Sequence, residues 1–102
     1  MQITGACRDG VLTLRFRGEL DHHAAREVMS AISERIDTFL PGKCVLDLRG
    51  LSFMDSSGIA LILRTVRLMQ ELGGETAVTG CGAQPLRVLR AAGLDRRVTI
   101  ME

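Results

Sequence analysis

The feature that most constrains the fold of this chain is the alternation of strand-like and helix-like segments along its 102 residues. Two strands joined by the turn Asp9-Gly10 open the chain, and the later strands are separated by amphipathic segments with helical spacing. Strands that follow helices pair in parallel through right-handed crossovers, whereas a hairpin pairs antiparallel. The sequence therefore predicts one α/β domain over residues 1–102, in the order β-β-α-β-α-β-α-β. We expect a mixed, mostly parallel sheet with helices packed on it.

The boundaries follow from residues that start or stop regular structure. Asp21 is an N-cap for the first helix, Pro41-Gly42 ends that helix, Gly73-Gly74 ends the second, and Gly93 ends the third. The first helix should bury a stripe of Ala25, Val28, Met29, Ile32, Ile36 and Phe39. The expected strands are residues 2–7, 11–17, 44–48, 76–79 and 97–101, the expected helices are 22–40, 57–72 and one starting near Pro85, and 49–55 is a loop.

Composition excludes several classes of function. The chain has 13 basic and 12 acidic residues, a formal charge of +1, which gives no electrostatic footprint for nucleic acid or an anionic membrane. Aromatic residues make up 3% and include no Trp or Tyr, so platforms for stacking bases are missing. No apolar run approaches the roughly 20 residues of a membrane span, and the N-terminus lacks the layout of a signal peptide, so we expect a cytoplasmic protein.

Three cysteines, Cys7, Cys44 and Cys81, stand far apart and inside or beside predicted strands. An odd, widely spaced set without C-x-x-C is a poor disulfide framework. We expect each to be a small buried apolar residue rather than a metal ligand or a redox sensor.

The most informative stretch is Asp55-Ser56-Ser57-Gly58, after a predicted strand and at the start of a predicted helix. In open α/β sheets, functional sites gather beyond the carboxyl ends of strands. A helix N-terminus has unpaired N–H groups and about half a positive charge, so it accommodates a phosphate. A serine there can expose its hydroxyl to a kinase, and Gly58 leaves the approach open. Simple capping is the competing explanation, because serine and aspartate are preferred N-cap residues.

The helix behind these serines has two apolar stripes. The first should meet the sheet and comprises Ile59, Ile62, Leu63, Val66 and Met69. The second falls nearly opposite and comprises Leu61, Leu68 and Leu72. This second stripe either packs against a neighbouring helix or forms a partner surface, and the pattern leaves both open.

A hydrolase would use Ser56 as the nucleophile, His22 or His23 as the base, and Asp21 or Asp55 as the orienting acid. The context of Ser56 is not the G-x-S-x-G nucleophile elbow, because position 54 is Met. We therefore expect no enzymatic activity.

Metal and nucleotide sites find little support in the sequence. Adjacent histidines on a helix point about 100° apart, so His22 and His23 do not converge on one ion. Gly80-Cys81-Gly82 lacks the third glycine of a dinucleotide-binding motif and follows a late strand. We expect no metal and no cofactor, while nucleotide binding stays undecided.

Taken together, several segments resemble the anti-sigma factor antagonists, which are bacterial members of the STAS domain family, and most of all their sporulation members, which antagonise the anti-sigma-F factor. The likeness covers nearly the whole chain, and the string Phe-Met-Asp-Ser-Ser-Gly is its most specific part. The segments that carry it are Gly18-Glu19-Leu20-Asp21-His22-His23-Ala24, Leu46-Asp47-Leu48, Leu51-Ser52-Phe53-Met54-Asp55-Ser56-Ser57-Gly58, Gly73-Gly74-Glu75 and Ala92-Gly93-Leu94.

The resemblance implies a switch. Family members bind an anti-sigma factor that is also a serine kinase, and so free the sigma factor. The kinase phosphorylates the serine that matches Ser56, which switches binding off, and a serine phosphatase reverses this. By the same matching, Asp55, Ser57 and Gly58 shape the site and Asp21 lies beside it.

For the partner surface we expect His22, His23, Leu61 and Leu68, on a chain that is a monomer when free. The alternative within the same family is a stand-alone STAS module of a stress-sensing or transporter-associated assembly, which has the same fold and different partners.

Overall fold

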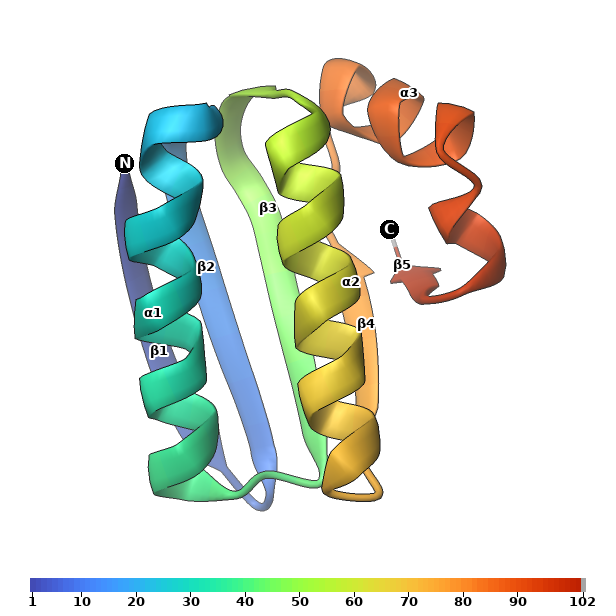
Figure 1. Cartoon of the computed structure of the whole chain (residues 1–102). Helices are drawn as coiled ribbons and strands as arrows, with labels where there is room; N and C mark the ends of the chain where they lie inside the picture. Colours follow the sequence, from blue (N-terminus) through green and yellow to red (C-terminus); the bar gives the residue numbers. More distant parts are fainter. Residues whose placement is uncertain (102) are drawn as a thin grey trace.

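A computed structural model describes residues 1–101 of the chain. The predicted order of elements is confirmed, with one short 3-10 helix added (Figure 1). The elements are β1 (Gln2–Arg8), β2 (Val11–Leu20), α1 (His22–Phe39), β3 (Lys43–Met54), α2 (Ser56–Glu71), β4 (Glu75–Thr79), α3 (Ala83–Ala91), η1 (Leu94–Arg96) and β5 (Thr99–Met101).

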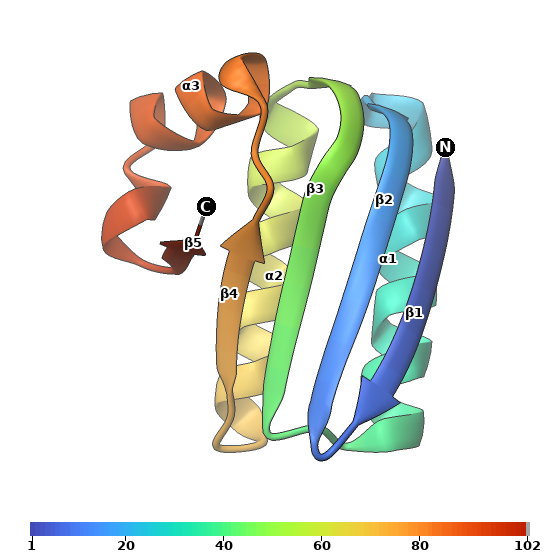
Figure 2. The same ribbon diagram turned by 180° about the vertical axis from the view of Figure 1, so that it is seen from behind.

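The five strands form one sheet in the order β1-β2-β3-β4-β5. β1 pairs with β2 antiparallel, and Asp9 and Gly10 between them have positive φ angles, as the predicted tight hairpin requires. The remaining neighbours pair in parallel, because a helix returns the chain to the same edge each time. α1 and α2 lie side by side on one face, and Figure 2 shows β1 to β4 from the other face, without a helix in front of them.

The core lies between the sheet and this helical layer. In β2 the alternation separates buried Leu12, Leu14 and Phe16 from exposed Arg15 and Arg17. The matching residues of β3 and the inner stripe of α1 also belong to the core, and they are Cys44, Leu46, Leu48, Val28, Met29, Ile32 and Ile36.

The three cysteines of the chain differ in how deeply the fold buries them. All three cysteines are free thiols. Cys44 is buried as predicted, and burial raises its pKa to about 12, whereas Cys7 and Cys81 are only half-buried. Burial also raises the pKa of the half-buried Cys81.

Within residues 1–101, no helix combines the length and the apolar character needed to cross a membrane.

The structure corrects three predicted details. β3 runs from Lys43 to Met54, so the loop expected at 49–55 is mostly strand. Two register shifts between β2 and β3 bend these two strands. Leu51 and Met54, in the added part of β3, are buried like the strand residues before them. β5 begins at Thr99 and not at residue 97, because η1 ends at Arg96 and the N–H groups of Arg97 and Val98 still donate to the Leu94 carbonyl, at 2.9 and 3.0 Å. Phe39 is 50% exposed, since the buried stripe of α1 ends one turn earlier at Ile36.

Gly50 makes the bend of β3 possible, and this gives a test of the fold. A methyl group at position 50 would overlap the backbone carbonyl of Phe16. We expect Gly50→Ala to lower the free energy of unfolding by about 1–3 kcal/mol in urea denaturation, as overpacking does elsewhere. Gly42→Ala is the matched control, because its nearest contact would be an ordinary 3.9 Å. Equal stability of the two variants would contradict this role for Gly50.

Candidate functional site

The carboxyl ends of β2 and β3 lie next to each other and carry the residues singled out in the sequence. Leu20 and Met54 are register partners at the ends of these parallel strands, and the N–H of Asp55 donates to the Leu20 carbonyl at 3.3 Å. α1 starts at His22 and α2 at Ser56, each one residue beyond an aspartate. The two helix N-termini therefore stand together at one edge of the sheet (Figure 1).

Both helices are capped by aspartate. Asp21 Oδ1 accepts a hydrogen bond from the Ala24 N–H at 2.9 Å, as predicted for an N-cap. This bond stabilises the charged form and lowers the pKa of Asp21. Asp55 Oδ1 accepts from the Ser57 N–H at 2.8 Å, so Asp55, rather than a serine, caps α2. Neither helix has an acidic residue in its first turn.

Because Asp55 is the cap, the Ser56 side chain has no capping role. Ser56 is the first residue of α2 and is exposed. Within residues 1–101 its hydroxyl makes no hydrogen bond, so the oxygen is open to reaction from solvent. Ser57 differs, since it is half-buried and lines a hollow between α1 and α2.

Gly58 has a packing role that the sequence did not indicate. It is buried in the first turn of α2, and a methyl group there would overlap the Met54 side chain and lie 3.2 Å from Leu20 Cδ2. We expected Gly58 to leave the approach to Ser56 open, but its missing side chain faces the strand ends instead of solvent. Glycine here lets the helix start close against β2 and β3.

His22 and His23 are both exposed in the first turn of α1, and their rings meet edge to face at 5.8 Å between centroids. In the part of the chain that the structure describes, no hydrogen bond joins either histidine to Ser56. No cluster of His, Cys, Asp and Glu among residues 1–101 has a metal-binding arrangement.

The prediction that Leu61 belongs to a partner surface is wrong. Leu61 is 3% exposed and is part of the core, at the bottom of the hollow between α1 and α2. Leu68 is half-buried and also packs on the core. The buried side chains of α2 cover a wider arc of the helix than the predicted inner stripe does. They are Leu61, Ile62, Thr65, Val66 and Met69. The sequence left open whether Leu61 packs against a neighbouring helix or faces a partner. In the structure it packs between α2 and the neighbouring helix α1.

Gln84 in α3 binds the backbone of Met54, the residue before Asp55, and the sequence did not indicate this contact. Its Oε1 accepts a hydrogen bond from the Met54 N–H at 2.9 Å, and its Nε2 donates to the Met54 carbonyl at 2.8 Å. Both ends of the side-chain amide are used, so the strand end before Asp55 is fixed from α3. Nothing in the local pattern distinguishes this glutamine from one facing solvent.

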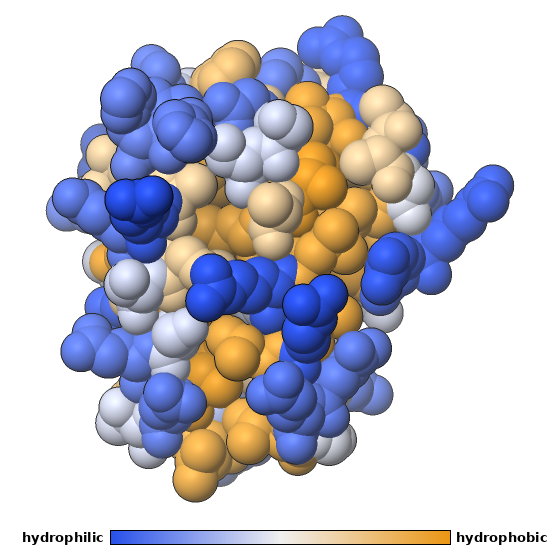
Figure 3. All heavy atoms as spheres, in the orientation of Figure 1, coloured by the Kyte–Doolittle hydropathy of each residue, from blue (hydrophilic) through white to orange (hydrophobic). Residues whose placement is uncertain are grey.

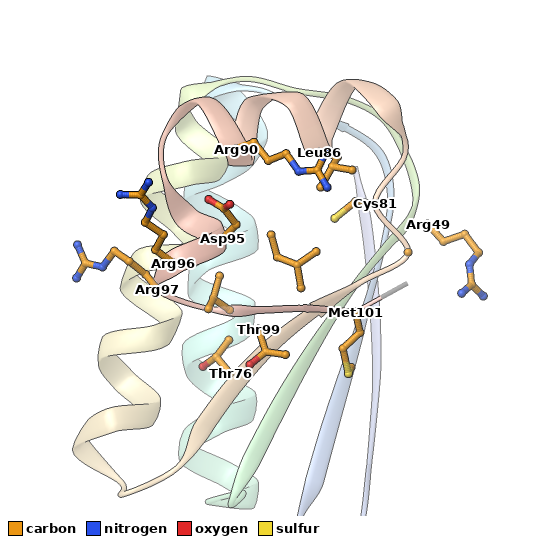
Figure 4. Close-up of a pocket in the computed structure, with 13 residues that line it drawn as sticks. Arg49, Thr76, Cys81, Leu86, Arg90, Asp95, Arg96, Arg97, Thr99 and Met101 are labelled. Atoms are coloured by element: carbon orange, nitrogen blue, oxygen red, sulfur yellow. The ribbon is translucent and has the colours of Figure 1, made fainter.

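A larger hollow, of about 1040 Å³, lies elsewhere, between α3, η1 and β5. Figure 4 shows Asp95 and Arg90 near it, while Arg49, Arg96 and Arg97 extend away. Neither Asp55 nor Ser56 lines it, so the site at the strand ends is a separate place on the surface.

The two hydrogen bonds of Gln84 give a test of its role. Gln84→Glu keeps the shape but cannot donate to the Met54 carbonyl, and Gln84→Ala removes both bonds. We expect each change to lower the free energy of unfolding by about 1–2 kcal/mol. Exchange of the Met54 amide hydrogen, followed by NMR, should become at least tenfold faster, whereas exposed Gln70→Ala should leave it unchanged. Unchanged exchange in Gln84→Ala would rule out this anchoring.

Comparison with known proteins agrees with the likeness seen in the sequence. Residues 2–102 match the STAS domain family. An anti-sigma F factor antagonist from Paenibacillus polymyxa is 37% identical over 102 residues, 100% of this chain and 87% of that protein.

Two solved structures have the same fold and are 26% identical to this chain. The unphosphorylated anti-sigma factor antagonist SpoIIAA matches with a TM-score of 0.85 over 99% of this chain and 89% of its own. The phosphorylated form of the Bacillus cell fate determinant SpoIIAA matches with a TM-score of 0.75, over 99% and 92%. With its sheet order, its paired helix N-termini and these relatives, the chain belongs to the STAS domain family.

Proposed function

We propose that this chain is an anti-sigma factor antagonist whose binding is switched by phosphate on Ser56. The unphosphorylated form binds an anti-sigma factor that is also a serine kinase, and the sigma factor is released. Phosphorylation of Ser56 ends this binding, and a serine phosphatase restores it. The observation that carries the proposal is the exposed, unbonded hydroxyl of Ser56 at the first position of α2. Relatives named anti-sigma F factor antagonists, and a phosphorylated structural relative, support it.

The helix N-terminus explains how the domain accepts a phosphate without unfolding. A phosphoserine carries about −1.5 to −2 charges at neutral pH. The dipole of α2 offsets part of this charge, and the first turn of α2 contains no carboxylate. Ser56 lies outside the core, so the added group displaces no packed side chain.

The same charge explains why a partner would be lost. A protein surface docked over Ser56 must either desolvate the phosphate or meet it with opposite charge. Burying an unpaired charge costs several kcal/mol, and each 1.4 kcal/mol is about tenfold in affinity. Partial burial therefore suffices to end binding. The exposed His22 and His23 beside the strand ends are the predicted partner residues that the structure leaves accessible.

Identification of the partner tests the proposed function. We expect the immobilised chain to capture a serine kinase from cell extract without ATP and to release it when ATP is added. Mass spectrometry should then find phosphate on Ser56, and Ser57→Ala should be modified like the wild type. Phosphate on a Ser56→Ala protein at the wild-type level would overturn the assignment of Ser56. Capture of a different class of protein would instead favour the stress-sensing or transporter-associated STAS module.

The Asp55 carboxylate caps α2 and also places a negative charge beside the phosphate, and two variants separate these roles. Asp55→Ala removes the cap and should lower the free energy of unfolding by about 1 kcal/mol while the melt stays cooperative. Asp55→Asn keeps a capping oxygen but removes the charge. We expect both variants to change the rates of phosphorylation and dephosphorylation, because like charges disfavour one another. Wild-type rates in Asp55→Asn would mean that Asp55 is a structural cap only.

A further inference from the structure

A groove runs along the outer side of the helical layer, between α1 and α2. It consists of two hollows, of about 650 Å³ beside Ser57 and about 450 Å³ further along the helices. Arg26, Met29 and Arg64 line both hollows, so the two lie next to each other. We call this feature the α1–α2 groove, and Figure 3 views the face of the molecule on which it lies.

The half of the groove nearest Ser56 has an apolar bottom and basic walls. Met29 and Leu61, 8% and 3% exposed, lie at the bottom, and Arg26 and Arg64 are exposed at the sides with His22 and His23 at the end. No carboxylate lines this half. The acidic residues Glu34 and Asp37 line only the more distant hollow.

The two arginines are not used inside the molecule. Within residues 1–101, neither Arg26 nor Arg64 forms an ion pair; the pair present joins Arg15 to Asp47 at 3.7 Å, away from the groove. The acidic side chains near the start of α1 line a different hollow, which includes Glu19, Asp21 and Glu27. The half of the groove nearest Ser56 therefore carries positive charge without a carboxylate, and it lies beside two helix N-termini whose dipoles have the same sign.

We infer that the α1–α2 groove binds an acidic, amphipathic segment of the anti-sigma partner. An apolar side chain of that segment would enter the hollow between Ala25 and Ala60, above the buried Met29 and Leu61, and its carboxylates would pair with Arg26 and Arg64. Arginine suits this role because its planar guanidinium binds carboxylates in a bidentate manner. This inference rests on the proposed function and adds the chemistry of the contact to it.

The position of the groove explains why a phosphate on Ser56 would affect binding of the segment. Ser57 lines the groove and Ser56 precedes it, so a phosphate on Ser56 would stand at the basic end. There it would repel the carboxylates of the segment and compete for the positive charge that attracts them. Phosphorylation would thus weaken the contact electrostatically, without any change in the fold of this domain.

Charge reversal at the groove is the test, read as affinity for the captured kinase by titration calorimetry. We expect Arg64→Glu and Arg26→Glu, on different helices, each to weaken binding at least tenfold and to reduce its dependence on salt. Arg64→Lys keeps the charge but loses the bidentate geometry, so it should weaken binding less than Arg64→Glu does. Arg67→Glu is the matched control, because Arg67 is exposed on the same helix but lines neither hollow, and it should bind like the wild type.

The outcomes separate this inference from the proposed function. Tight binding by both charge-reversal variants, together with loss of binding on Ser56 phosphorylation, would overturn the groove and leave the switch intact. Absence of kinase binding by the wild type would overturn the proposed function itself. If inorganic phosphate or ATP alone shifts the NMR signals of the groove residues at submillimolar concentration, the groove is a small-anion site and the inference is wrong.

Discussion

The parallel pairing of β2 with β3 determines where everything else at the site lies. Both strands end at the same edge, with Leu20 opposite Met54, and each is followed by an aspartate and a helix. Their pairing therefore places two helix N-termini together. Gly50 allows the strands to bend and Gly58 allows α2 to start close against them, so the geometry depends on two positions where a methyl group does not fit.

The electrostatics of this edge favour a reversible charge. Two N-cap aspartates satisfy backbone N–H groups, while the first turns of both helices contain no carboxylate. Ser56 is the first residue of α2, and it is exposed. Under the proposed function, a phosphate added there would meet a favourable helix dipole and the domain would tolerate it, whereas a surface docked over it would not. In our proposal, the contrast between these two environments would make phosphate a switch rather than a denaturing modification.

The sequence predicted the element order, the hairpin turn and the Asp21 cap, because each depends on local chemistry that is visible in a few residues. It also predicted that Asp55-Ser56-Ser57-Gly58 lies between a strand end and a helix start, which is where the proposed site lies. Features set by tertiary packing were harder to predict. The helical period of α2 allowed two apolar stripes, and only the position of α1 shows that Leu61 is buried. The contact of Gln84 with Met54 joins residues 30 positions apart, and no local pattern predicts it. β3 extends past residue 48 because β2 continues beside it.

The measurement that tests the central claim most directly is the affinity of the anti-sigma kinase for this chain, with and without phosphate on Ser56, by titration calorimetry. The account predicts tight binding by the unphosphorylated protein and by Ser56→Ala. The stoichiometrically phosphorylated protein and Ser56→Asp should bind at least tenfold more weakly, with circular dichroism spectra nearly unchanged. Equal affinities for all four proteins, or loss of binding that accompanies unfolding of the phosphorylated domain, would contradict it.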